Sequence, residues 1–149
     1  MPMETKKPVR LDSRKVLTTE EIRDKLSLLF KEEGLELVLL FGSVVKGDIH
    51  KRSDIDLAFQ FDKPIDILSL TNRVIRLLHT DNIDVIDIKR SSPLLRYSIA
   101  KNCRLLYEKL PGMFNEFCSL AFKMYVDTKK LRNAQAKAIG HYLQAKGLL

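Results

Sequence analysis

Hydrophobic residues follow two different spacings in the first part of the chain. Apolar positions three and four apart run from Thr18, which is placed to cap a helix, to Gly34, which is placed to end it. Residues 35–41 (LELVLLF) form a continuous apolar run, which is typical of a buried strand. Residues 55–61 (IDLAFQF) alternate apolar and polar positions, which is typical of a strand with one face in the core. The pattern predicts one helix followed by two strands.

The rest of the chain continues this alternation of helices and strands. It predicts, in order, a helix that begins near Pro64 and has Leu68, Val74, Ile75 and Leu78 on its inner face, a strand over 82–88, a helix from Pro93 to about Lys101, an edge strand over 104–107 and helix from Pro111 onward. The short connection between the first two strands allows an antiparallel pair, and the next helix allows a parallel crossover. We therefore expect an α/β (α+β) domain in which helices flank a small mixed β-sheet.

Length and composition fit one soluble domain. The chain has 149 residues, of which 45% are hydrophobic and 30% are charged. We expect a flexible basic N-terminal segment (1–16), a core (17–110) and a C-terminal helical extension of the same domain (111–149). The sequence contains neither a signal-peptide pattern nor an apolar run long enough to span a membrane. Cys103 and Cys118 do not form a C-x-x-C pair, so we expect reduced, structural cysteines in a cytoplasmic protein without a membrane partner.

The charge distribution limits the classes of partner. The net charge of +7 favours nucleic acid, phosphates or an acidic protein surface, without choosing among them. The C-terminal segment is the most basic part of the chain, and two interpretations of it stay open: a solvated helix, or a docking arm for an acidic partner. Its charged residues over 121–149 are Lys123, Lys129, Lys130, Arg132, Lys137 and Lys146 against Asp127.

Two aspartates lie on one face of the second predicted strand. Asp54 and Asp56 are two residues apart, so their Cα atoms are expected about 6.5–7 Å from each other on the same side. Carboxylates at this spacing suit one or two Mg²⁺ ions, which proteins hold with few carboxylates together with substrate phosphates. A third carboxylate is available from Asp84 or Asp87, which point to opposite faces of a regular strand. Alternation alone does not decide between them.

The segment between the first two strands offers groups that bind phosphate. Gly42 allows a close approach of the backbone, and the Ser43 hydroxyl can donate a hydrogen bond to a phosphate oxygen. Lys46, Lys51 and Arg52 can neutralise a triphosphate, although solvated loop bases are equally common.

The ordered set of Gly42-Ser43, ten further residues and Asp54-Ile55-Asp56 resembles the signature of the DNA polymerase β-like nucleotidyltransferase superfamily. The small size and the acidic third strand resemble its minimal nucleotidyltransferase branch, and the C-terminal helix resembles that of the antitoxin members, which pair with a HEPN-domain ribonuclease toxin. The resemblance implies the polymerase β-like fold, metal ligation and catalysis by Asp54, Asp56 and Asp84, and nucleotide binding by Gly42, Ser43, Lys46 and Arg52. It also implies Mg²⁺, with two ions, as the cofactor and ATP as the substrate.

The resemblance implies that AMP passes from ATP to a hydroxyl of the HEPN toxin, a tyrosine in the antitoxin members. Two other functions stay open at this point. The protein can act as a binding module that neutralises its partner by complex formation, or as a nucleotidyltransferase acting on a small molecule such as an aminoglycoside. Direct nucleic-acid binding is not expected, because the chain has no evident module for a template or stem.

Overall fold

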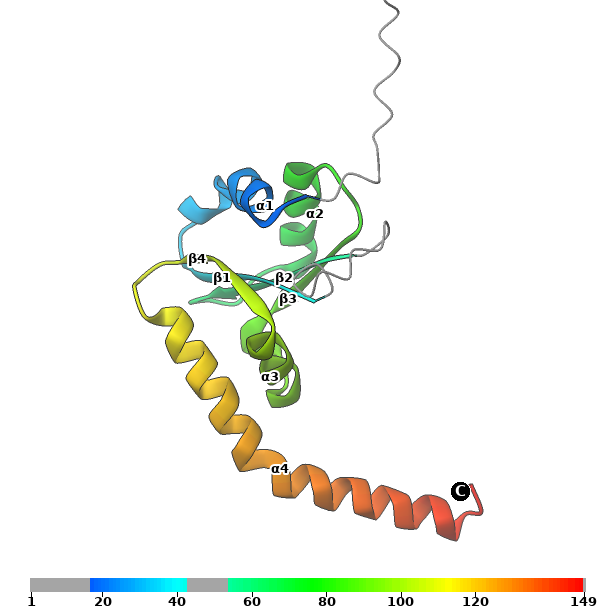
Figure 1. Cartoon of the computed structure of the whole chain (residues 1–149). Coiled ribbons are helices and arrows are strands. Elements are labelled where there is room, and N and C mark those ends of the chain that lie inside the picture. The colour runs from blue at the N-terminus through cyan, green and yellow to red at the C-terminus, as the bar shows by residue number, and fades with distance from the viewer. Residues whose placement is uncertain (1–16, 43–53, 149) are drawn as a thin grey trace, which may run out of the picture.

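The computed structural model describes residues 17–42 and 54–148, which form a four-stranded sheet with helices on both faces (Figure 1). No helix within these two ranges has the length and apolar character of a membrane span. The elements in chain order are α1 (Thr19–Leu26), the 3₁₀ turn η1 (Leu29–Lys31), β1 (Leu35–Phe41), β2 (Ile55–Phe61), α2 (Ile67–Leu78), β3 (Ile83–Asp87), the 3₁₀ turn η2 (Ile88–Arg90), α3 (Pro93–Lys101), β4 (Cys103–Glu108) and α4 (Met113–Ala145).

The sheet is mixed, as the sequence predicts. Its strand order is β3-β2-β1-β4, with β1 antiparallel to both β2 and β4 and with β2 parallel to β3. The parallel pair is joined by α2, which provides the crossover that such a connection requires. Strand β4 occupies the predicted edge position.

Each face of the sheet packs into its own apolar core. Ile55, Leu57 and Phe59 of β2 lie in the core under α1 and α2. Ala58 of the same strand lies in the core under α3 and the first part of α4, with Phe117. Figure 1 shows α1 and α2 on one side of the sheet and α3 on the other. The alternation predicted for β2 is therefore confirmed, and Asp56 belongs to the face that α3 and α4 cover.

The first helix is shorter than predicted. Thr18 caps it, because its Oγ1 accepts a hydrogen bond from the Glu21 N–H at 3.1 Å, but α1 ends at Leu26 instead of continuing to Gly34. The turn η1 follows and places the Phe30 ring on the Tyr107 ring of β4, with centroids 4.9 Å apart. A continuous helix does not make this turn onto the sheet.

The second helix begins later than predicted. Asp66 caps α2, because its Oδ1 accepts hydrogen bonds from two backbone N–H groups of the first turn at 3.1 and 3.3 Å, and Pro64 lies before the helix. Leu68 is 70% exposed, so its assignment to the inner face was wrong. The buried stripe of α2 is Leu70, Val74 and Leu78, spaced four residues apart.

The edge strand β4 has a side chain laid against its backbone. Arg23 of α1 donates hydrogen bonds to the carbonyl oxygens of Leu105 at 2.9 Å and Leu106 at 3.3 Å. Leu106 lies where the register between β1 and β4 shifts, at an irregularity of the ladder. The guanidinium therefore satisfies carbonyl groups that this irregular edge leaves available.

The last helix extends well beyond the sheet. Of the 33 residues of α4, only Phe117 and Ala121 are buried, and Figure 1 shows its second half standing away from the body after a change of direction. The Thr128 hydroxyl donates to the Met124 carbonyl at 2.7 Å, and Arg132 donates to the Tyr125 carbonyl at 2.9 Å. Side chains that bond to helix carbonyls in this way bend a helix. We call the residues from 126 to 145 the arm.

Candidate active site

The site is built around the contact between the end of β1 and the start of β2. Phe41 pairs with Asp56 in the antiparallel ladder, so the next residue, Gly42, lies directly against the Asp56 side chain. Gly42 has a φ of +84°, and a Cβ at this position would overlap Oδ2 of Asp56. Only glycine meets both demands, the left-handed backbone and the missing side chain. The sequence suggested a phosphate contact for Gly42, and its role in making room for the carboxylate was not foreseen.

The parallel ladder distinguishes Asp84 from Asp87. Asp84 is the register partner of Asp56, so the two carboxylates project from neighbouring strands on the same face. Asp87 is the partner of Phe59, which lies in the core of the opposite face. Its Oδ1 accepts a hydrogen bond from the Lys89 N–H at 3.1 Å and so caps η2. The geometry thus places Asp84 beside Asp56 and gives Asp87 a local structural bond.

This arrangement changes the pKa of the Asp56 carboxyl. Burial raises the pKa of its carboxyl from the ordinary 3.8 to about 6, and the negative charges of Asp84 and then Asp54 add to the increase. Asp56 is half-buried, whereas Asp54 and Asp84 are exposed. A half-buried carboxylate flanked by two others is an unfavourable arrangement that a bound cation relieves.

The donor set fits Mg²⁺. Carboxylate oxygens are the protein ligands that this ion prefers, and Mg²⁺ is usually completed by water and substrate phosphates. Within residues 17–42 and 54–148, no three His, Cys, Asp or Glu side chains come close enough to enclose a metal ion by themselves. The structure brings Asp56 beside Asp84, and the three carboxylates of Asp54, Asp56 and Asp84 do not form a closed metal cage by themselves.

The part of the chain that contains the sheet matches a known protein family. Residues 24–111 match the family described as polymerase beta, nucleotidyltransferase. The chain belongs to this nucleotidyltransferase family. The match begins in α1 and ends after β4, so it contains the whole sheet and the acidic trio.

Relatives of this nucleotidyltransferase are similar over almost their full length. The protein adenylyltransferase MntA of Aphanizomenon flos-aquae is 26% identical over 147 residues, which cover 90% of this chain and 98% of the relative. A toxin–antitoxin crystal structure with AMP-PNP has a TM-score of 0.70 at 24% identity and covers 83% of this chain and 98% of its own. A structure of tri-AMPylated Shewanella oneidensis HEPN toxin with MNT antitoxin has a TM-score of 0.67 at 20% identity over 82% and 98%. The two structures establish the nucleotidyltransferase fold.

Part of the predicted nucleotide site lies outside the described residues. Ser43, Lys46 and Arg52 fall in the segment 43–53, so their predicted phosphate contacts stay predictions, as does the flexibility of the segment 1–16.

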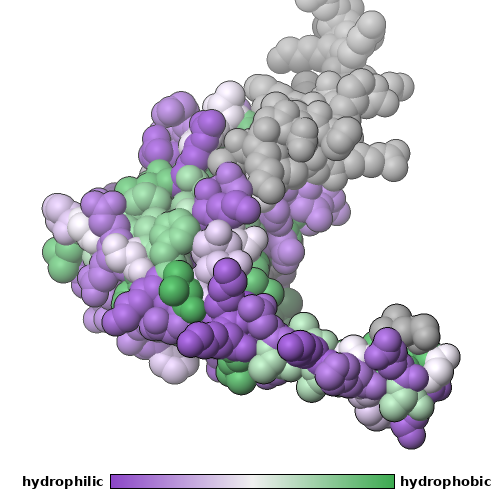
Figure 2. Space-filling view, turned by 60° about the horizontal axis from the view of Figure 1, so that its bottom comes forward, coloured by the Kyte–Doolittle hydropathy of each residue, from purple (hydrophilic) through white to green (hydrophobic). Residues whose placement is uncertain are grey.

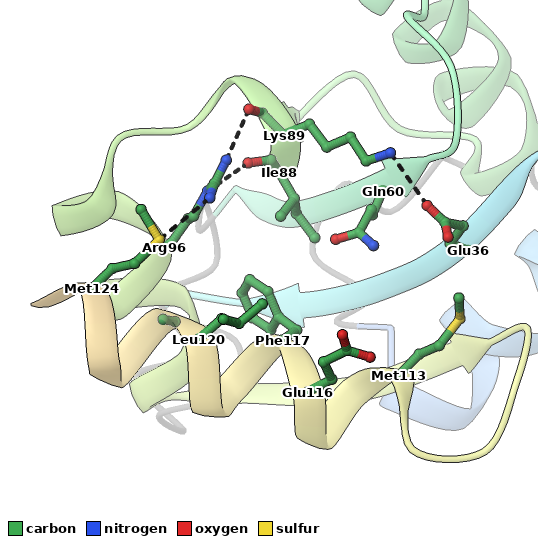
Figure 3. Close-up of a pocket in the computed structure, with 11 residues that line it drawn as sticks. Glu36, Gln60, Ile88, Lys89, Arg96, Met113, Glu116, Phe117, Leu120 and Met124 are labelled. Atoms are coloured by element: carbon green, nitrogen blue, oxygen red, sulfur yellow. Dashed lines mark hydrogen bonds and ion pairs between the residues drawn. The ribbon is translucent and has the colours of Figure 1, made fainter.

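A pocket of about 290 Å³ opens on the face of Asp56, away from the acidic trio (Figure 3). It lies between the sheet and α4, beside Glu36 at the start of β1, whereas Gly42 follows the end of that strand. Its bases already have partners: Lys89 pairs with Glu36 at 3.4 Å, and Arg96 donates to the Lys89 carbonyl at 2.8 Å. Leu120 and Met124 of α4 line its wall. These engaged charges do not form a phosphate site, and the acidic trio remains the candidate for the chemistry.

Proposed function

We propose that this nucleotidyltransferase transfers AMP from ATP to a hydroxyl of a HEPN-domain ribonuclease toxin in the cytoplasm and thereby acts as its antitoxin. The observation that carries the chemistry is the register that brings Asp84 beside the half-buried Asp56. The protein acceptor is supported by the relative named a protein adenylyltransferase, which matches over 98% of its length. The HEPN partner is supported by the structural neighbours solved as toxin–antitoxin complexes.

In the proposed reaction, the acceptor oxygen attacks the α-phosphorus of ATP. The new bond joins this oxygen to the α-phosphorus, the bond from the α-phosphorus to the bridging oxygen of the β-phosphate breaks, and pyrophosphate leaves. Two bound Mg²⁺ ions would supply charge neutralisation at the triphosphate and activation of the acceptor oxygen. Asp54, Asp56 and Asp84 are the residues that would hold them, and the carboxylate of Asp84, which is exposed, can take the proton of the hydroxyl.

The groups around the trio position the nucleotide. Gly42 keeps the Asp56 carboxylate free of steric contact, so its oxygens stay available to a ligand. Ser43, Lys46 and Arg52 are proposed to bind the phosphates, as hydrogen-bond donor and as charges.

Intact-mass spectrometry of a HEPN-domain toxin tests the proposal. After incubation with Mg²⁺, ATP and the wild-type protein, we expect its mass to rise by whole adenylyl units. Asp54→Asn and Asp84→Asn should abolish the increase, whereas the matched Asp87→Asn, altered on the same strand as Asp84 but on the opposite face, should keep it. A partner that stays unmodified and still forms a stable complex would contradict transfer and support neutralisation by binding.

A further inference from the structure

The residue two positions before Asp84 belongs to the same face of the sheet. Asn82 directly precedes β3, and its carbonyl accepts a hydrogen bond from the Ile55 N–H at 2.8 Å, which continues the parallel ladder between β2 and β3 by one residue. Ile83 and Val85 pack with the core under α1 and α2. Alternation along the strand therefore directs the side chains of Asn82 and Asp84 to the opposite face, the face of Asp56.

The register makes Asn82 the neighbour of Asp54. The first residues of β2 and β3 pair with each other, so the residues just before them are neighbours as well. The candidate site thus has two rows across these strands, with Asp56 beside Asp84 and Asp54 beside Asn82. The rows are two residues apart along the strands, which is about 6.5–7 Å. A neutral amide is therefore the fourth member of a site whose other three members are carboxylates.

The side-chain amide of Asn82 is available to a ligand. The residue is exposed, and its backbone is held on both sides, because its N–H donates to the Thr80 hydroxyl at 3.3 Å and its carbonyl accepts from Ile55. Within residues 17–42 and 54–148, no hydrogen bond joins the side-chain amide to another residue, Asp54 and Asp84 included. The NH₂ donor and the carbonyl acceptor of the amide are both open there.

The place of Asn82 across the sheet indicates which reactant it meets. The strand order puts Gly42, which follows β1, on one side of the β2 aspartates and puts Asn82, which precedes β3, on the other. In the proposed reaction the nucleotide phosphates lie on the side of Gly42, and Asp84 takes the proton of the acceptor hydroxyl. The acceptor therefore lies on the side of β3. Figure 2 shows that the arm stands clear of the body, which leaves space on that side of the molecule for an acceptor as large as a protein.

From the register and the open amide, we propose that Asn82 binds the acceptor protein through a peptide group of the residue that is modified. A hydroxyl placed at Asp84 lies about 6.5–7 Å from Asn82, so the amide meets a different part of the acceptor. A peptide group offers one N–H and one carbonyl, which match the carbonyl and the NH₂ of the asparagine side chain. Asn82 is then a specificity-determining residue for a protein acceptor. The inference rests on the proposed function for the existence of that acceptor.

Substitutions of Asn82 test the inference. Asn82→Ala removes both hydrogen-bonding groups, and Asn82→Gln keeps them on a side chain that is one methylene longer. Asn72→Ala is the matched control, because it makes the same change at an exposed asparagine of α2. Asp81→Ala is the local control, because it alters the exposed residue next to Asn82. Circular dichroism and thermal melting check that all four variants fold as the wild type does.

Two measurements give the outcome. The first is the KM for a HEPN-domain toxin and the kcat of AMP transfer, followed by intact mass, and the second is the Kd for AMP-PNP with Mg²⁺ by titration calorimetry. We expect Asn82→Ala to raise KM for the toxin about tenfold or more, since two hydrogen bonds to the acceptor are lost. The kcat should stay within about threefold of wild type and the Kd for AMP-PNP within about twofold, because the nucleotide lies on the other side of the site. Asn82→Gln should raise KM less than Asn82→Ala, and both controls should behave as wild type.

Other outcomes would contradict the assignment. A KM that is unchanged in Asn82→Ala, while the wild type transfers AMP, would overturn the inference and leave the proposed function standing. A weaker Kd for AMP-PNP, or a fall in kcat at an unchanged KM, would place Asn82 with the nucleotide or the carboxylates and would also overturn it. A wild type that transfers no AMP to the toxin would overturn the proposed function and the inference together.

Discussion

Replacing Asp56 by asparagine should make the protein more stable in the absence of metal. The wild-type carboxylate is half-buried between two other aspartates, and its pKa is raised from 3.8 to about 6. At neutral pH the carboxyl is charged in both states, but only in the folded protein is this charge partly buried beside two other carboxylates, which makes it unfavourable there. Asparagine has nearly the same shape and no charge, so it removes the cost of burying the charge and the repulsion by Asp84 and Asp54, and it keeps the packing. A catalytic residue held at a cost in stability is a familiar form of the trade-off between stability and activity.

The size of this effect follows from the pKa. A difference between 3.8 and about 6 corresponds to at most about 3 kcal/mol at about 1.4 kcal/mol per pKa unit. Because the side chain is partly exposed, solvent screening reduces this ceiling, and we expect a gain of about 1 kcal/mol for Asp56→Asn at pH 7.5. For a chain of this length, that gain raises Tm by roughly 2–4 °C.

The raised pKa also predicts how the free energy of unfolding changes with pH. A carboxyl with a raised folded-state pKa binds more protons in the folded than in the unfolded state between about pH 4 and pH 6. The free energy of unfolding of the wild type therefore falls as pH rises through this window, relative to a variant without the group. The difference in the free energy of unfolding between Asp56→Asn and the wild type should be largest at pH 7.5, smaller at pH 5 and nearly zero at pH 4.

The assay is urea denaturation of both proteins in a chelator at these pH values. Asp87→Ala serves as the control of opposite sign, because it removes the carboxylate oxygen that caps η2 and should lose about 1 kcal/mol. Millimolar Mg²⁺ should stabilise the wild type more than Asp56→Asn, so the difference between their free energies of unfolding should become smaller. An Asp56→Asn protein that is less stable than wild type at pH 7.5, or a gap independent of pH, would refute the reasoning.

Three further predictions concern other parts of the chain. Gly42→Ala should reduce AMP transfer at least a hundredfold while the fold persists, because its Cβ would overlap the neighbouring carboxylate oxygen; transfer is followed by intact mass and the fold by circular dichroism. Burial raises the pKa of Cys103 to about 11 and raises that of Cys118, so both thiols should resist alkylation at pH 8 and react rapidly in urea, as read by mass spectrometry. Phe117→Ala should cost about 3–5 kcal/mol in urea denaturation and Leu120→Ala less than about 1 kcal/mol, since only the first is buried.

The pattern of β1 and β2 was sufficient to predict the centre of the fold. Both strands have the predicted bounds, Leu35–Phe41 and Ile55–Phe61, because a continuous apolar run and a clean alternation each permit one arrangement. Helix ends were less predictable. Asp66 competes with Pro64 for the start of α2, and a local cap decides the outcome only once its backbone partners are in place.

The candidate site could likewise be predicted only in part from the sequence. That Asp54 and Asp56 share a face follows from strand periodicity alone. The choice of Asp84 over Asp87 depends on the register between β2 and β3, which is a contact between residues far apart in sequence. The contact of Gly42 with Asp56 likewise depends on the antiparallel ladder, so no local signal predicts it.

The hydrogen bonds from Arg23 to β4 have a consequence for solubility. The outer edge of a sheet is a template on which strands of other molecules can add, and edge-to-edge addition leads to aggregation. Arg23 places a positive charge and two donated hydrogen bonds at this edge, on the carbonyls of Leu105 and Leu106. A strand from another molecule would have to displace the Arg23 guanidinium from these carbonyls. It would also have to pack next to the displaced positive charge. One side chain of α1 thus discourages polymerisation of a sheet whose edge no further strand covers within residues 17–42 and 54–148.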